Sequence, residues 1–105
     1  MKDLAPIALF VYNRLDHLKA TIFALKKNYL AKSSELFIFS DGPKKDIDND
    51  DIEIFKVRNY LAKIKGFKNI TIIRRSQNLG LSNNIITGIS MVIKKYKKII
   101  ILEDD

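Results

Sequence analysis

The stretch that decides the fold is Ile99-Ile100-Ile101-Leu102-Glu103-Asp104-Asp105. Four consecutive apolar residues suit a β-strand that is buried on both faces. Three carboxylates follow at the point where such a strand would leave the core, and they repel one another unless a cation or water meets them. Their oxygens suit Mg²⁺ or Mn²⁺. The stretch therefore predicts a metal site at the edge of a parallel sheet, with a solvated acidic turn as the alternative.

The composition predicts one globular domain, or part of one, in 105 residues. The absence of cysteine excludes disulfides and thiolate metal sites. No apolar run approaches the roughly 20 residues that span a bilayer, and residues 1–6 lack the apolar core of a signal peptide. We therefore expect a cytoplasmic protein, with peripheral association at the inner face of a membrane left open.

The net charge of +7 comes mostly from lysine, and Lys94, Lys95, Lys97 and Lys98 surround Tyr96. Such a patch could attract nucleic acid, an anionic membrane or a phosphorylated ligand. The alternative is a solvated helix end, where cations favour the C-terminal dipole. Because no recognised nucleic-acid motif accompanies the charge, we expect no nucleic-acid partner.

Apolar and amphipathic segments alternate along the chain. Short apolar segments predict strands over 6–12, 35–40, 69–74 and 98–102. Spacings of three and four predict helices with apolar stripes, which comprise Leu15, Leu18, Ile22, Leu25 and Tyr29, then Ile54, Val57, Leu61 and Ile64, then Ile85, Ile89, Val92 and Tyr96. The alternation implies right-handed crossovers between parallel strands. The expected fold is a three-layer α/β/α domain with a mostly parallel four-stranded sheet.

Two polar segments precede the first two predicted helices. Asn13 is a candidate N-cap for the first. Before the second, Asp46, Asp48, Asp50 and Asp51 lack the glycine and final glutamate of an EF-hand loop, so we interpret this run as solvated.

Polar side chains follow every predicted strand, at the edge where open parallel sheets bind ligands. They are Tyr12, Asn13 and Arg14, then Asp41 and Gly42, then Arg74 and Arg75, then Glu103, Asp104 and Asp105. An aromatic ring can stack on a base, and Asp41 can accept a hydrogen bond from a base imide or a ribose hydroxyl. A metal ion bound by the carboxylates could bridge a diphosphate. The residues at this edge therefore predict a nucleotide site. Each residue also has a plainer interpretation: Tyr12 packs under a loop, Arg14 pairs with a carboxylate, and Asp41-Gly42 forms a turn.

Other nucleotide-binding folds do not fit. The sequence has neither the G-x-G-x-x-G of a dinucleotide site nor the G-x-x-x-x-G-K-[ST] of a P-loop. Receiver domains place an acidic pair after the first strand, where this chain has Tyr12-Asn13-Arg14.

Four segments together resemble the N-terminal, nucleotide-binding half of a GT-A-fold glycosyltransferase of the inverting family 2 type. They are Ala5-Pro6-Ile7-Ala8-Leu9-Phe10-Val11-Tyr12-Asn13-Arg14, Ser40-Asp41-Gly42, Gln77-Asn78-Leu79-Gly80-Leu81 and Leu102-Glu103-Asp104-Asp105. They cover nearly the whole chain in the family's order. The chain is also similar to the N-acetylglucosaminyltransferases that make β1,2 linkages.

The resemblance implies a role for each matching position. Tyr12 would lie against the base, with Asn13 and Arg14 beside it, and Asp41 would bind uracil or its ribose. Glu103-Asp104-Asp105 stands in the place of the family's D-x-D-like motif, where Asp105, with Glu103, would bind Mn²⁺ or Mg²⁺ and Asp104 would approach the sugar or ribose. The donor would be a nucleotide-sugar, expected to be a UDP-sugar. The acceptor would be a glycan or a lipid-linked molecule, as in polysaccharide assembly.

The chain departs from the family pattern in two ways. Many family members carry Ala-Arg-Asn where this chain has Asn84-Ile85-Ile86, and whether Arg75 replaces that arginine is left open. The sequence also ends at the metal motif, so the acceptor site and catalytic base are expected beyond it and the 105 residues are interpreted as an inactive fragment. Two alternatives stay open: a sugar nucleotidyltransferase-like domain, and a non-catalytic α/β domain whose basic patch binds a partner.

Overall fold

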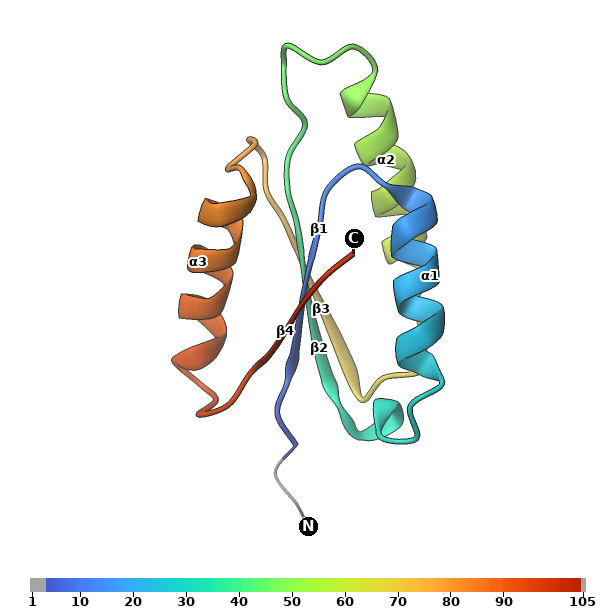
Figure 1. Ribbon diagram of the computed structural model, residues 1–105, viewed down its shortest axis with the longest axis vertical. Helices are drawn as coiled ribbons and strands as arrows, with labels where there is room; N and C mark the ends of the chain where they lie inside the picture. Colours follow the sequence, from blue (N-terminus) through green and yellow to red (C-terminus); the bar gives the residue numbers. More distant parts are fainter. Residues whose placement is uncertain (1–3, 105) are drawn as a thin grey trace.

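Four parallel strands form one open sheet in the order β3-β2-β1-β4 (Figure 1). The computed structural model describes residues 4–104. The strands are β1 (Ile7–Val11), β2 (Glu35–Ser40), β3 (Asn69–Arg74) and β4 (Ile100–Glu103). The helices are α1 (Leu15–Lys26), the 3₁₀ turn η1 (Ala31–Ser33), α2 (Asp50–Leu61) and α3 (Leu81–Ile93). The predicted α/β class and parallel pairing are confirmed, and β2 and β3 have the predicted bounds.

The helices cover both faces of the sheet, with α1 and α2 on one face and α3 on the other (Figure 1). Side chains along β1 alternate between these two layers, as the pleat of a strand requires. Leu9 packs with Leu18 of α1 and Val57 of α2. Phe10 points the other way, where its ring stacks on Phe39 at 5.1 Å between centroids. The predicted three-layer architecture is therefore confirmed.

Helix α3 approaches the sheet closely at Gly88. A Cβ added there would lie 2.6 Å from Cε1 of Phe10 and 3.2 Å from Cδ1 of Phe39. Only glycine leaves the two stacked rings in place at this point.

Strand β4 corrects the prediction of a strand buried on both faces. Ile100 and Ile101 are 45% and 44% exposed, because β4 is an edge strand in the described sheet and α3 packs over β1 rather than over β4. The strand also begins at Ile100 rather than at Lys98, and it includes Glu103. An apolar run is compatible with an edge position as well as a central one, and this ambiguity made the prediction wrong.

Three further expectations about helix ends need correction. Tyr29 lies beyond the end of α1 and is 88% exposed, so it is not part of the apolar stripe. Tyr96 lies beyond α3 but still packs edge-on against Phe37, at 5.9 Å between ring centroids. Asn13 does not cap α1, whose N-cap position is Arg14. Over the described part of the chain, every helix is too short or too polar to cross a bilayer.

Candidate functional site

A cavity of about 410 Å³ opens at the carboxyl ends of the strands. The chain runs from β1 to β2 to β3 in one direction and then returns to place β4 on the other side of β1, so the strand order reverses between β1 and β4. Open α/β sheets bind ligands at such a reversal. All four polar strand ends or the loops beside them contribute to the lining, which comprises Phe10 to Arg14, Asp41, Lys44, Asn78, Gly80, Leu81, Asn84, Glu103 and Asp104.

Asp41 is buried at the centre of this edge, with 3% of its surface exposed. Its Oδ1 accepts hydrogen bonds from the backbone N–H groups of Gly42 and Leu79 at 2.9 and 2.8 Å. Its Oδ2 accepts one from the N–H of Gly80 at 3.1 Å and a longer one from Nδ2 of Asn78 at 3.4 Å. Gly80 has φ +82°, a conformation that glycine adopts without strain. Asp41 therefore holds the loop that enters α3, and this also explains the Asn78-Leu79-Gly80 segment.

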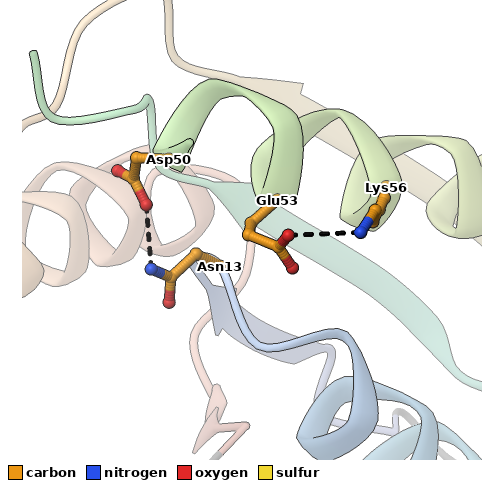
Figure 2. Close-up of polar contacts among 4 residues, drawn as sticks. All are labelled: Asn13, Asp50, Glu53 and Lys56. Carbon is orange, nitrogen blue, oxygen red and sulfur yellow. Dashed lines mark hydrogen bonds and ion pairs between the residues drawn. The ribbon is translucent and has the colours of Figure 1, made fainter. Parts of the chain in front are cut away.

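Asp50 is a second buried carboxylate, 1% exposed, at the start of α2. It accepts a short hydrogen bond from the hydroxyl of Tyr12. Asn13 Nδ2 donates to it at 2.9 Å (Figure 2), and the backbone N–H of Lys44 donates at 2.7 Å. The interpretation of the 46–51 run as solvated was wrong for this residue. Asp50 ties the loop after β1 to the loop after β2, on which Tyr12, Asn13 and Lys44 line the cavity.

Burial and hydrogen bonding determine the protonation states of Tyr12 and Asp50. Burial, the hydrogen bond to Asp50 and its charge all raise the pKa of Tyr12, so the phenol stays a neutral donor near pH 7. For Asp50, burial alone would raise the pKa, but hydrogen bonds from Tyr12, the Lys44 N–H and Asn13 outweigh it and the net pKa is lowered. The pair is therefore a neutral phenol donating to an ionised carboxylate.

Arg58 of α2 also forms hydrogen bonds at this edge of the sheet. Its Nε donates to Oγ of Ser40 at 3.0 Å, and its Nη2 lies 3.1 Å from the carbonyl oxygen of Asp41 and 2.8 Å from that of Arg75. Burial, and then the charge of Arg74, lower the pKa of Arg58, but the guanidinium stays charged at pH 7. Arg58 thereby joins the ends of β2 and β3.

Arg75 is predicted as a site residue but does not line the cavity, and the same is true of Gly42 and Arg74. The Nε of Arg75 donates to Oδ1 of Asn84 at 3.1 Å and its Nη2 to Oγ1 of Thr87 at 2.9 Å. Asn84 is itself buried and donates to the carbonyl of Phe39 at 3.2 Å. Arg75 lies along α3 and is not among the residues that line the cavity.

The acidic end of β4 reaches the cavity with two carboxylates. Glu103 and Asp104 line it, the first exposed and the second half-buried; Asp105 lies outside the described residues. Residues 4–104 contain no group of three or more histidine or acidic side chains that would enclose a cation on their own. Mg²⁺ commonly uses one or two carboxylates together with substrate phosphates, and the donor set of Glu103 and Asp104 fits that kind of site.

Two cationic side chains border the cavity in the described part of the chain. Arg14 is exposed at its rim, and Nζ of Lys44 lies 5.7 Å from the centre of the Tyr12 ring. Sequence reasoning selected Arg14 but missed Lys44, Asp50, Arg58 and Asn84. The only signal for Lys44 was its place three residues after Asp41, and nothing in the sequence distinguishes Asp50 from its acidic neighbours.

One comparison with known protein families agrees with this structure. It accounts for the parallel sheet, the cavity at the strand reversal, and the aromatic and acidic side chains around that cavity. The family described as "Glycosyl transferase family 2" matches residues 7–105, which is almost the entire chain. No curated protein and no solved structure gives a significant match. The chain belongs to glycosyl transferase family 2.

Proposed function

We propose that this chain binds the nucleotide-sugar donor of a glycosyltransferase, with a UDP-sugar as the donor and a glycan or lipid-linked molecule as the acceptor. The observation that carries the proposal is the cavity of about 410 Å³ at the strand reversal. Tyr12, two cationic side chains and three carboxylates meet there, and they come from the ends of β1, β2 and β4. The cavity volume lies in the usual range for small-molecule sites. Family membership supports glycosyl transfer over nucleotidyl transfer and over a non-catalytic role.

The base would bind beside Tyr12. The hydrogen bond to Asp50 fixes the phenol at the cavity wall, where the ring offers a stacking surface. Both oxygens of Asp41 already accept hydrogen bonds within the chain, and the contact from Asn78 Nδ2 to Oδ2 is the longest of them at 3.4 Å. An imide N–H or a ribose hydroxyl would therefore bind Oδ2 by displacing the Asn78 amide.

The diphosphate would lie between the cations and the acidic end of β4. Arg14 and Lys44 supply positive charge on one side. On the other side, Glu103 and Asp104, together with Asp105, would hold Mn²⁺ or Mg²⁺. When bound, such an ion supplies Lewis-acid neutralisation of the leaving diphosphate. In the transfer itself, the bond from the sugar C1 to the diphosphate oxygen breaks as the acceptor hydroxyl oxygen bonds to C1 and gives its proton to a base. We assign no base among the cavity residues, and we expect donor binding without sugar transfer from the 105-residue chain.

The test is calorimetric titration of UDP into the chain with Mn²⁺ and with EDTA. We expect metal-dependent binding that falls by roughly tenfold or more in Asp104→Asn, which loses a charged ligand, and in Tyr12→Leu, which loses a stacking surface worth about 1–3 kcal/mol. Tyr29→Leu is the matched control, because this exposed tyrosine lies at the opposite end of the sheet. Binding that is independent of metal and retained in both cavity variants would contradict the proposal.

A further inference from the structure

The end of the molecule opposite the cavity is rich in lysine. Three segments lead from a helix to the next strand, at 27–34, 62–68 and 94–99. Together they contain nine lysines and no aspartate or glutamate. Because the strands are parallel, these segments gather at one end of the sheet, at the bottom of Figure 1. The excess positive charge behind the formal net charge of +7 is therefore concentrated at this one end of the sheet.

Contacts between the segments make this basic end continuous. The backbone N–H of Lys68 donates to the carbonyl of Ser34 at 2.9 Å, which joins the second segment to the first. A shallow depression of about 560 Å³ extends from there to the third segment. Its lining includes Lys68, Lys95, Lys97 and Lys98, and Glu35 is the acidic residue among the described residues that line it. The carboxylate nearest to this group in the sequence, Glu35, accepts a hydrogen bond from Nδ2 of Asn69 at 2.8 Å.

Exposed apolar side chains lie among these lysines. Tyr29 is 88% exposed and Leu30 is 38% exposed, and the pair stands between Lys27 and Lys32 in the turn after α1. Tyrosine is enriched at the interface between membrane and water, where its ring meets the acyl chains and its hydroxyl stays hydrated. A basic surface that carries an exposed tyrosine has the chemistry of a peripheral membrane contact.

We propose that this basic end docks on the surface of an anionic phospholipid bilayer. Lysines near such a surface are attracted by its negative potential, and each adds to the binding. All four arginines, which would suit bidentate recognition of individual nucleic-acid phosphates or bases, lie in or beside the cavity end instead, at positions 14, 58, 74 and 75. The helices α1, α2 and α3 also present their C-terminal ends here, so their N-termini, which could bind single phosphates, lie at the other end of the sheet. Docking in this orientation leaves the cavity, at the other ends of the strands, open to solvent.

The experiment is cosedimentation of the 105-residue chain with phosphatidylcholine vesicles that contain or lack phosphatidylglycerol. We expect binding only to the anionic vesicles, and its loss when salt rises from about 0.1 M to about 1 M, which shortens the screening length from about 10 Å to about 3 Å. The triple variant Lys95→Gln, Lys97→Gln, Lys98→Gln should bind roughly 100-fold more weakly, at about fivefold per lysine. Tyr29→Ser should weaken binding by a smaller factor that persists at intermediate salt.

The matched control is Lys19→Gln, Lys45→Gln, Lys56→Gln, which removes the same charge from α1, from the loop after β2 and from α2. Retained vesicle binding in this variant, with loss in the first triple variant, supports the proposal. Equal loss in both triple variants would show a net-charge effect and overturn it. Binding to plain phosphatidylcholine, or stronger binding to a DNA duplex than to anionic vesicles, would overturn it as well.

Discussion

The two ends of the sheet carry charge in opposite ways. At the cavity end, Asp41 and Asp50 are almost fully buried and each accepts several hydrogen bonds. At the other end, nine lysines in three segments stand in solvent with no acidic residue among them. A buried charge is stable only when its hydrogen bonds are satisfied, whereas exposed charges add little to stability. We therefore expect substitutions of the buried carboxylates at the cavity end to reduce stability more than substitutions of the exposed lysines at the opposite end.

The largest effect should come from Asp41→Asn. The amide keeps one acceptor oxygen but turns an NH₂ group toward backbone N–H donors, so at least one buried N–H loses its partner. We expect the free energy of unfolding to fall by about 3 kcal/mol, measured by urea denaturation. Asp48→Asn makes the same chemical change at an exposed position of the following loop and should cost less than about 0.5 kcal/mol. Equal effects in the two variants would remove the distinction between buried and solvated acids.

A smaller, pH-dependent effect is expected for Asp50→Asn. The folded-state pKa of Asp50 lies below its ordinary value of 3.8. Its carboxylate therefore contributes stability above that pH, and the contribution is lost as the pH falls through the folded-state pKa. The variant should be less stable than the natural sequence by about 1–2 kcal/mol at pH 7, and this difference should shrink in denaturation curves recorded below the ordinary pKa. Asp51→Asn, exposed and next in the chain, is the control; a pH-independent difference for Asp50→Asn would contradict the expectation.

The smallest effect should come from the exposed ion pair on α2, between Lys56 Nζ and Glu53 Oε2 at 3.2 Å (Figure 2). Both side chains are largely exposed, so Glu53→Gln should change the free energy of unfolding by only about 0.3–0.5 kcal/mol. Thermal or urea denaturation at low and high salt measures this, and salt should abolish the difference. If Glu53→Gln lowered the free energy of unfolding by more than about 1 kcal/mol, exposed charges would contribute substantially to stability. The contrast between buried and exposed charges would then not hold.

The fold was predictable because its signals are local. The segments 35–40 and 69–74 are apolar runs with turn residues on either side, and both form strands at those bounds. The position of the cavity followed from topology, since every parallel strand delivers its polar residues to the same edge. These inferences need only the order of elements along the chain.

The missed features depend on contacts between distant segments. Asp50 is one of several acidic residues in its loop, and only its contact with Tyr12, 38 residues earlier, makes it a buried anchor. Arg75 follows a strand like the other polar residues, but a pairing with Asn84 and Thr87 draws it along α3. The apolar run of β4 did not reveal that the strand lies at the edge. Local sequence identifies candidates, and the packing decides which of them meet.

The hydrogen bonds to Asp41 also have a consequence for how a phosphorylated ligand can be held. Helix α3 begins beside the cavity, and the positive end of its dipole would ordinarily attract a phosphate. In this chain the N–H groups of Leu79 and Gly80 already point at a carboxylate, which acts as a resident anion at that helix end. A diphosphate entering the cavity would find these two N–H groups already engaged, so more of its counter-charge would come from side chains such as Arg14 and Lys44 or from a bound cation.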